Sequence, residues 1–499
     1  MPEVELCRKS KEAINMNASI SLENENIMDM NISRWSDIDW PTAYAHVNRL
    51  QARIAKAQKN GKKNLVKRLQ HLLVNSFYAK CVAVRKVTTN KGKRTPGVDK
   101  VLWETPKQKL DAVRDLNPIG YRAKPLRRKF IPKKNGKMRP LSIPTMKDRA
   151  MQALYALALD PVSETTADLH SYGFRKYRGP RDAARRLYAD LYQTDAGQWV
   201  VEGDIRGCFD HISHEWLMKN IPMDKRILKQ FLDAGYVLDK KLFPTSEGTP
   251  QGGVISPILA NMTLDGIEDM LDREYRNKWI KIGRSSSKNP HKVHLVRFAD
   301  DFVITCDSKE TASDIIEKMI EFLDERGLEL SKEKTLITNV YDGFDFLGYN
   351  FRKRQDGKLW ITPSEKSVES VKKHLKDITK KLAAATQDNL IGALNPVIRG
   401  WGMYYRNFVA KETYYDIDHY LWIILWSWAR RRHDDKSSKW IHSRYWTHPA
   451  TRWEFKGEEL TLEHMSDIKI IRHTLIKADA NPYLDGQYFD HRYGRDTHE

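Results

Sequence analysis

The sequence predicts an α+β fold followed by a helical part. Apolar runs rich in Val, Ile and Phe end at or enclose acidic residues at 199–204 and 295–306, which is typical of β-strands. Beyond Pro363, apolar residues recur every three or four positions over 368–382, which indicates a helix packed along other helices. A chain of 499 residues is too long for one compact core, so several domains are expected.

An adjacent pair of acids, Asp300 and Asp301, lies between the two apolar runs of 295–306. This pattern predicts a strand–turn–strand hairpin with both carboxylates at its tip. Adjacent carboxylates repel each other unless a positive charge lies beside them, and Mg²⁺ favours oxygen ligands together with substrate phosphates. An isolated pair of this kind is more often a solvated acidic turn than a metal site.

A third acid follows an earlier predicted strand. The apolar start of 199–204 leads into Asp204, and Gly207 then allows the chain to turn. If this strand pairs with the hairpin, three carboxylates converge, and such a set can hold two metal ions for in-line phosphoryl transfer. Gly252 and Gly253 lie between the two segments, where the backbone could approach a nucleotide closely or form an ordinary loop before a helix.

Five motifs, in this order and spacing, resemble the reverse transcriptases of the group II intron maturase type. They are Asp204 to Phe209, Pro250-Gln-Gly-Gly253, Phe298-Ala-Asp-Asp301, Gly327-Leu-Glu-Leu-Ser-Lys-Glu-Lys-Thr335 and Phe346-Leu-Gly348. The likeness extends from about Trp35 to Tyr488. It implies a right-hand polymerase with fingers and an antiparallel palm sheet, a three-helix thumb and a small C-terminal domain.

The resemblance also implies the chemistry of the site. Asp204, Asp300 and Asp301, with the backbone of Ile205, would hold two Mg²⁺ ions. Lys334 would act as a general acid toward the departing pyrophosphate, although a lone lysine after a helix is ordinarily a solvated charge.

Two further positions take roles from the same family. Phe209 lies where an aromatic ring meets the incoming sugar and would clash with a 2′-hydroxyl, so deoxynucleotides would be preferred. Without the motif, Phe209 is as compatible with the core as with this role. Leu347 and Gly348 would form the primer grip.

A second hairpin is predicted at 125–148, turning at Asn135-Gly136. Its many positive charges suit a triphosphate, and the family places such a hairpin over the incoming nucleotide. Whether neighbouring basic residues exchange roles stays open. The candidate nucleotide contacts, including two in the glycine-rich turn, are Arg128, Lys134, Arg139, Gln251 and Gly252.

The positive charge is unevenly distributed. The formal net charge is +20 with a pI near 9.5. Residues 51–140 contain 26 Lys and Arg against 4 Asp and Glu, a surplus that exceeds the net charge of the whole chain. Interspersed aromatic residues favour a surface that follows nucleic-acid phosphates, with a merely solvated basic face as the alternative.

Helical patterns precede the predicted hairpin at 125–148. One predicted helix has Ala45, Leu50, Ile54 and Ala57 on its apolar face, and the next has Leu65, Leu69, Leu73 and Phe77. By the resemblance they form an RNA-binding N-terminal extension; by pattern alone they could be a helical hairpin packed on the core. The candidate RNA contacts are Lys62, Lys63, Lys67, Arg68, Lys91, Lys93 and Arg94.

The predicted domains are a polar tail (1–34), a helical extension (35–88), fingers and palm (89–356), a thumb (357–432) and a DNA-binding-like region (433–499). By the resemblance, longer relatives continue into an HNH endonuclease, which this chain is expected to lack. The four cysteines show neither disulfide nor zinc spacing. No apolar run is long enough to span a membrane and no secretory signal is evident, so a reducing, cytoplasmic location is expected, with an organelle as the alternative.

The sequence therefore predicts an RNA-directed DNA polymerase that copies an RNA template from a DNA primer with deoxynucleotides. The resemblance adds help in splicing a group II intron RNA and in its insertion into DNA. Two alternatives stay open. One is a polymerase of this lineage that acts in phage defence or repair, and the other is an RNA-binding maturase with a vestigial polymerase.

Overall fold

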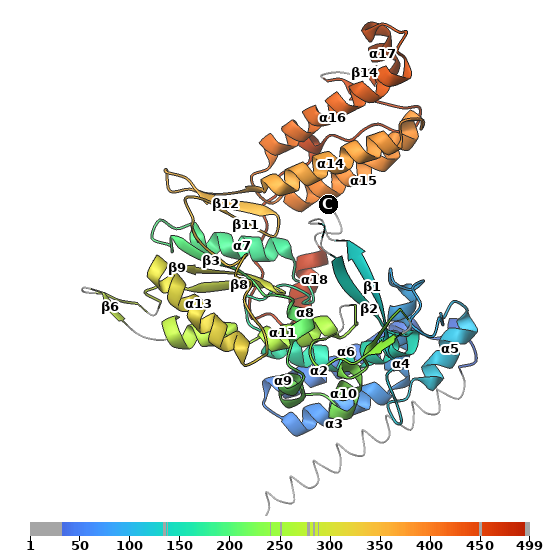
Figure 1. Ribbon diagram of the computed structural model, residues 1–499, viewed down its shortest axis with the longest axis vertical. Helices are drawn as coiled ribbons and strands as arrows, with labels where there is room; N and C mark the ends of the chain where they lie inside the picture. Colours follow the sequence, from blue (N-terminus) through green and yellow to red (C-terminus); the bar gives the residue numbers. More distant parts are fainter. Residues whose placement is uncertain are drawn as a thin grey trace, which may run out of the picture.

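The computed structural model describes residues 32–132, 136, 138–239, 241–249, 252–276, 280–282, 285–287, 289–448 and 452–494. Figure 1 shows the long helices of the C-terminal part at the top, the palm sheet in the middle and helices of the N-terminal part at the bottom. The sheets separate these two helical regions. The catalytic motifs lie on the sheet between them.

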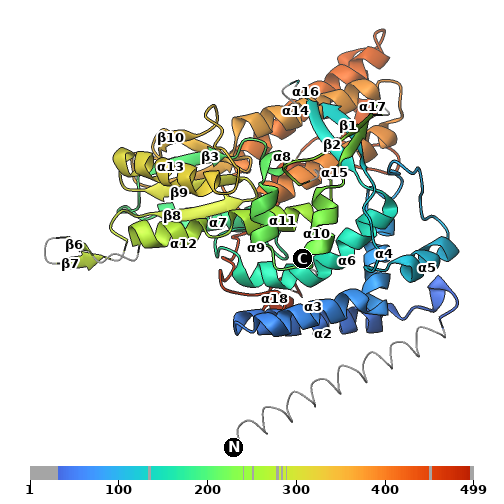
Figure 2. The same ribbon diagram turned by 60° about the horizontal axis from the view of Figure 1, so that its bottom comes forward.

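The N-terminal part is helical, as predicted, and α2 and α3 form its base (Figure 2). Two details of the prediction are wrong. The buried face of the first helix follows Ala43, Val47, Leu50, Ile54 and Ala57, so Ala45 is exposed on the opposite side. Phe77 starts a new helix, because the backbone of the buried Ser76 is extended and ends the preceding helix. The elements are η1 (Trp35–Asp37), α2 (Trp40–Lys59), α3 (Lys63–Asn75), α4 (Phe77–Thr89) and α5 (Pro106–Asp115).

The fingers sheet has the strand order β2-β1-β4-β5. Its strands are β1 (Leu126–Pro132), β2 (Met138–Ile143), β4 (Tyr236–Leu238) and β5 (Lys241–Phe243). The antiparallel pairing of β1 with β2 confirms the predicted hairpin. Of the predicted turn, Asn135 lies outside the described residues.

The palm sheet has the order β10-β3-β9-β8, and all its pairings are antiparallel. Its strands are β3 (Trp199–Asp204), β8 (His294–Phe298), β9 (Asp301–Cys306) and β10 (Leu336–Asn339). The helices around it and the fingers are α6 (Met146–Thr166), α7 (Pro180–Leu191), α8 (Cys208–His211), α9 (His214–Asn220), α10 (Lys225–Leu232), α11 (Ser256–Leu264), α12 (Ile267–Leu271) and α13 (Lys309–Asp324), with the π-helical turn η2 (Asp272–Arg276) and a ribbon of β6 (Ile280–Ile282) and β7 (Ser285–Ser287).

The palm sheet separates two hydrophobic cores. Side chains alternate along a strand, and Val201 and Ile304 face a core shared with α13 and the N-terminal helices, whereas Val200, Val296 and Val303 face a core shared with α7 and the thumb. By the same alternation, Asp204 and Asp301 lie on the thumb-facing side of the sheet. The strand register is therefore strongly specified, because a slip of one residue would exchange both faces.

The segment 344–351 forms a tight hairpin. Leu347 and Gly348 have φ values of 51° and 79° and join β11 (Phe344–Phe346) to β12 (Tyr349–Lys353), which pairs in turn with β13 (Leu359–Pro363). Two consecutive residues with positive φ fit a type I′ turn, whose twist matches that of the flanking strands.

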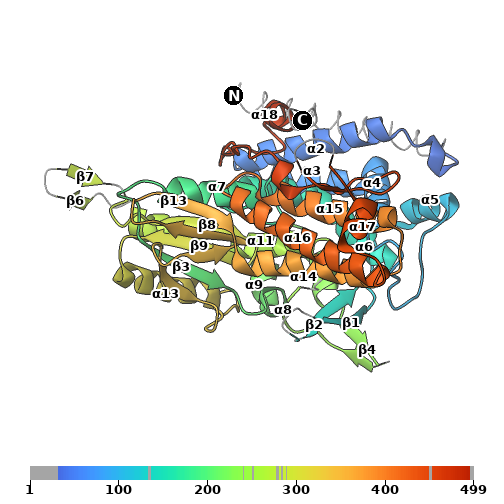
Figure 3. The same ribbon diagram turned by 90° about the horizontal axis from the view of Figure 1, so that it is seen from above.

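The thumb consists of three helices that lie side by side (Figure 3). They are α14 (Glu365–Lys381), α15 (Gln387–Tyr405) and α16 (Lys411–Arg432), and α14 agrees with the helix predicted over 368–382. The following elements are α17 (Ser438–Tyr445), β14 (Trp446–Thr447), β15 (Glu454–Phe455), η3 (Met465–Asp467) and α18 (Gly486–Gly494).

The C-terminal residues return from the thumb to the palm. Their buried side chains, among them Phe455, Met465 and Phe489, belong to the same core as the thumb helices. Near the end, Arg178 donates hydrogen bonds to the carbonyls of Ala478 and Ala480, and Tyr483 bonds to Asp160 on α6. The returning segment therefore ties the thumb to the palm.

The packing of β3 against β9 makes a direct prediction for Gly203→Ala. A Cβ at this position would lie 2.1 Å from the Phe302 ring, so the variant should lose at least about 3 kcal/mol of unfolding free energy. Gly400→Ala is the matched control, because its Cβ would meet nothing within 4 Å and alanine stabilises a helix interior by up to about 1 kcal/mol. Urea denaturation should separate the two, and equal stabilities would contradict the packing described here.

Candidate functional site

The strand register brings the predicted acids together. Asp204 at the end of β3 lies directly opposite Asp301 at the start of β9, and Phe298 of β8 pairs with Asp301 from the other side. The tip of the hairpin is a two-residue turn of Ala299 and Asp300, with Ala299 at a φ of 58°. Like charges directly opposite each other destabilise a sheet, so this arrangement is not one that packing alone would select.

Burial and neighbouring carboxylates raise the pKa of Asp300 and Asp301. Burial, the charges of Asp300 and Asp204, and a hydrogen bond with Asp204 raise the pKa of Asp301 to about 7. Burial and Asp204 also raise the pKa of Asp300 above its usual range, although Arg139 and Lys334 oppose the rise. The cluster therefore favours binding of positive charge.

Lys334 supplies one positive charge to this cluster. Its Nζ donates a hydrogen bond of 2.6 Å to Oδ2 of Asp204, and this bond raises the pKa of the lysine. The backbone beneath it is held in place, because the Ser331 N–H donates to the Asp204 carbonyl and the Lys334 N–H to the Ser331 carbonyl. The lysine predicted to serve the reaction thus lies with the three acids.

The buried Arg297 links the acidic turn to the core of the protein. Arg297 is fully buried in β8, and its Nη2 lies 2.5 Å from Oδ1 of Asp265, while its Nη1 donates to the carbonyl of Ala299 in the turn. Asp168 lies 3.9 Å from the same guanidinium. Burial raises the pKa of Asp265 to about 7 despite the opposing effect of Arg297.

The segment 170–173 runs alongside β8 and completes this support. The Arg297 N–H donates to the His170 carbonyl and the Tyr172 N–H to the Arg297 carbonyl. Gly173 follows, and a Cβ there would lie 2.2 Å from the backbone nitrogen of Ala299. This close approach requires glycine and fixes the position of the catalytic turn.

Several side chains of the loop that follows Gly173 contact other parts of the protein. Arg175 is buried and donates to Glu164, and Arg178 is buried beside the C-terminal segment. Tyr177 stacks on Phe489 and Tyr493 at 4.9 and 5.3 Å between ring centroids.

The fingers hairpin reaches the acids through Arg139. This residue lies on β2 near enough to lower the pKa of Asp300. Arg128 on β1 is half-buried, with its guanidinium 3.9 Å from the centroid of the Tyr236 ring. Gly252 has a φ of 106° and abuts β2 at Leu141 and Ser142. Lys134 and Gln251 lie outside the described residues.

Phe209 and the predicted primer grip occupy defined positions. Phe209 on α8 is half-buried and meets the exposed ring of Phe174 edge-to-face, with 6.2 Å between centroids. Leu347 and Gly348 form the β11–β12 turn, where the hydroxyls of Tyr404 and Tyr405 donate to their carbonyls. The turn is thereby attached to α15 of the thumb. Ile205 directly follows Asp204, is buried and bridges to Leu330.

The seven predicted RNA contacts are all exposed. Lys62, Lys63, Lys67 and Arg68 lie at the start of α3, whereas Lys91, Lys93 and Arg94 lie in the loop after α4. Buried Arg149 holds that loop by donating to the carbonyls of Gly92 and Thr95. The two groups are therefore presented on separate elements.

The donor set suits a hard divalent cation. Asp204, Asp300 and Asp301 offer only carboxylate oxygens, and burial together with neighbouring negative charge raises the pKa of Asp300 and Asp301, a strain that a cation would relieve. Within the described part of the chain, however, no group of three or more His, Cys, Asp or Glu residues has the arrangement of a preformed metal site. The fit thus rests on donor chemistry and electrostatics.

Sequence reasoning missed the buried support of the site. Arg297, Asp265, Asp168 and Gly173 carry no motif of their own. One signal was available: Arg297 is a charged residue in the otherwise apolar run Leu295 to Phe298, which indicates a buried partner. Its partner could not be inferred, because Asp265 lies 32 residues earlier.

Three family models match successive parts of the chain. They are the N-terminal domain of reverse transcriptase (residues 35–116), reverse transcriptase, an RNA-dependent DNA polymerase (131–351), and the group II intron maturase-specific domain (368–446). Protein YkfC of Escherichia coli is 37% identical over 307 residues, which are 54% of this chain and 80% of YkfC. The chain belongs to the reverse transcriptases of the group II intron type.

Other relatives are encoded in introns. The group II intron-encoded protein LtrA of Lactococcus lactis is 31% identical over 61% of this chain and 60% of its own length. A 91 kDa protein in a cob intron of Schizosaccharomyces pombe is 25% identical over 65% of this chain and 49% of its own length. These matches span half to three fifths of both intron-encoded relatives.

The predicted family, right-hand polymerase fold and enzyme class are confirmed. The reverse transcriptase domain implies binding of an RNA template and catalysis that depends on a divalent metal. In the described part of the chain, no helix is long and apolar enough to cross a membrane.

The role of Arg297 predicts a large effect of Arg297→Met. The variant would leave Asp265 buried without its cation, so it should lose about 3–5 kcal/mol of unfolding free energy. Adding Asp265→Asn should recover part of this loss, because the unpaired charge is then removed as well. Urea denaturation followed by tryptophan fluorescence measures both.

Arg226→Met is the matched control, since Arg226 pairs with Asp224 on the surface. Its stability should be unchanged, because an exposed pair contributes little. Equal losses in Arg226→Met and Arg297→Met would contradict the supporting role of Arg297.

Proposed function

We propose that the chain extends a DNA primer along an RNA template with deoxynucleotides, using Asp204, Asp300 and Asp301 to bind two Mg²⁺ ions. The observation that supports this most strongly is the direct opposition of Asp204 and Asp301 across β3 and β9, next to Asp300. Bound ions would neutralise these carboxylates and stabilise charge on the transferred phosphoryl group. The backbone carbonyl of Ile205, which follows Asp204, is the proposed additional ligand.

Positively charged side chains would position the triphosphate. Arg139 already acts electrostatically on Asp300, so a phosphate beside that acid would also meet its guanidinium. Arg128 and Lys134 of the same hairpin, with Gln251 and Gly252 beside β2, complete the proposed nucleotide contacts. Because phosphoryl transfer needs little covalent chemistry from protein, such positioning would supply most of the rate.

Lys334 is the proposed proton donor to the departing pyrophosphate. Its ammonium group is held at Asp204 and is protonated at neutral pH, since the hydrogen bond raises its pKa. A protonated amine beside the acids is the state that a general acid requires.

The nucleic acid would lie between the fingers and the thumb. Leu347 and Gly348, attached to α15 through Tyr404 and Tyr405, are the proposed contacts to the primer. The exposed basic residues of α3 and of the loop at 91–94 would bind RNA phosphates outside the site. The maturase-specific match supports group II intron RNA as that RNA, and assistance in its splicing as a second activity.

The central prediction concerns Asp300→Ala combined with Asp301→Ala. Primer extension on an RNA template with Mg²⁺ and deoxynucleotides should fall by at least about 10³-fold, because the Mg²⁺ ions that would stabilise the negative charge of the phosphoryl group lose two of their proposed ligands. Asp434→Ala combined with Asp435→Ala is the matched control, because it removes an adjacent acid pair from an exposed turn.

The control should extend primers at the wild-type rate. Full activity in the Asp300/Asp301 variant would contradict the proposed site. No extension by the wild type, with salt-sensitive RNA binding retained, would instead favour a maturase without polymerase activity.

Phe209→Ala should change the choice of sugar. Without the ring, incorporation of ribonucleotides relative to deoxynucleotides should rise by at least about 10-fold. Phe174→Ala removes only the ring that packs against Phe209 and should have a smaller effect. An equal rise in both variants would show that packing between the rings, rather than contact of Phe209 with the sugar, sets the preference.

A further inference from the structure

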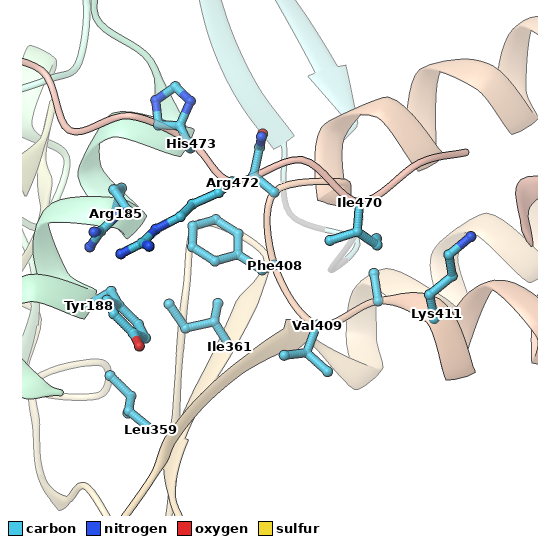
Figure 4. Close-up of a pocket in the computed structure, with 12 residues that line it drawn as sticks. Arg185, Tyr188, Leu359, Ile361, Phe408, Val409, Lys411, Ile470, Arg472 and His473 are labelled. Carbon is cyan, nitrogen blue, oxygen red and sulfur yellow. The ribbon is translucent and has the colours of Figure 1, made fainter. Parts of the chain in front are cut away.

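A cavity of about 710 Å³ lies at the junction of palm, thumb and C-terminal segment. Its walls come from α7, β13, the connection between α15 and α16, and residues 470–473 (Figure 4). Its volume lies within the range of pockets that bind small organic ligands, about 300–1,000 Å³. None of the active-site residues described above lines it.

Basic side chains line the cavity from several of its walls. Arg185, Lys411, Arg472 and His473 line it, and no Asp or Glu is among the lining residues. Lys411 and His473 are engaged with the Ser466 carbonyl and with Asp182. Neither arginine forms an ion pair with a carboxylate in the described part of the chain, and Nη1 of Arg185 is buried without a hydrogen-bond partner there.

The two arginines point toward one another in Figure 4. Two guanidinium groups that line one pocket without an acid repel each other, and a bound anion would relieve this repulsion. The planar fork of arginine matches phosphate oxygens in pairs, so a phosphate is the anion that this arrangement suits.

Apolar and aromatic side chains line the cavity beside the arginines. Tyr188 is already stacked on Tyr192, with 5.6 Å between centroids, and Arg185 lies 5.0 Å from its ring centroid. Phe408 meets Tyr349 edge-to-face, and its ring lies in the pocket beside Arg472 in Figure 4. Val409 and Ile470, both lining the cavity, are 44% and 40% exposed, so part of the apolar lining is accessible to a ligand.

We propose that this pocket binds one nucleotide, with its phosphate between Arg185 and Arg472 and its base against Phe408. Stacking on an aromatic ring accepts any base, and the phosphate contact adds charge without reading sequence. The nucleotide is either one unit of a single-stranded RNA or a free nucleotide, since both present the same chemistry. This site lies apart from the polymerase site and does not rest on the proposed polymerase activity.

The test uses the full-length protein bound to saturating unlabelled primer–template, which occupies the polymerase cleft. The probe is a 5′-fluorescein-labelled RNA of eight adenosines, followed by fluorescence anisotropy. Arg185→Gln combined with Arg472→Gln should weaken its binding by at least about 10-fold, because both phosphate contacts are removed. Phe408→Leu should weaken it without changing the charge.

Arg226→Gln combined with Lys229→Gln is the matched control, because it removes two charges from exposed positions on α10. It should leave binding within twofold of the wild type, and primer extension should be unchanged in every variant. Should the double arginine variant prove unstable, Arg472→Gln alone serves, since this residue has no ion pair to lose among the described residues.

Unlabelled AMP distinguishes the two sources. Displacement of the labelled RNA by AMP would identify a free nucleotide as sufficient, whereas variant-sensitive binding without displacement would identify an RNA strand. Binding that is equally strong in the arginine variant and in the α10 control would overturn the proposal.

Discussion

The structure depends most on one buried guanidinium. Arg297 belongs to the strand that leads into the acidic turn, and its side chain connects that turn to Asp265, which directly follows α11. A buried charge of this kind is stable only with its partners in place, so the turn, the segment 170–173 and the connection between α11 and α12 are positioned together. These contacts therefore hold the acids at the hairpin tip close together although their charges repel one another.

The palm sheet extends this constraint to the whole molecule. One face packs on α13 and the N-terminal helices, and the other on α7 and the thumb. Because the register decides which residues face which core, the same alternation that buries Val201 and Val303 also places Asp204 opposite Asp301. The C-terminal segment then fixes the thumb to the palm through Arg178, Tyr483 and Asp182. Figure 1 shows how this segment leads back to the middle of the molecule.

The sequence was informative where chemistry or periodicity is local. The hairpins at 125–148 and 295–306 follow from alternating apolar residues and turn residues, and the thumb helices follow from a repeat of three and four. The tight turn at Leu347 and Gly348 has a weak local signal, because leucine is not a typical residue for a positive φ. Phe77 was misassigned because a single extended serine interrupts an otherwise continuous helical pattern.

Long-range partners were beyond sequence reasoning for a physical reason. Arg297 with Asp265, Gly173 with Ala299, and Arg178 with Ala480 meet through the tertiary fold alone, and no periodicity links their positions. The cavity at Arg185 and Arg472 also forms only in the tertiary fold, because these two arginines are 287 positions apart in the chain. Residues brought together in this way carry no local signature, even when they support the site directly.

The central claim is that the three carboxylates bind divalent cations. It is tested most directly by Mn²⁺ binding, measured by electron paramagnetic resonance on the wild-type protein and on Asp204→Asn, both bound to primer–template. We expect saturable Mn²⁺ binding in the wild type that is lost or weakened at least about 10-fold in the variant, because one of the three negatively charged ligands is removed without a change of shape. Equal Mn²⁺ binding by the two folded proteins would contradict it.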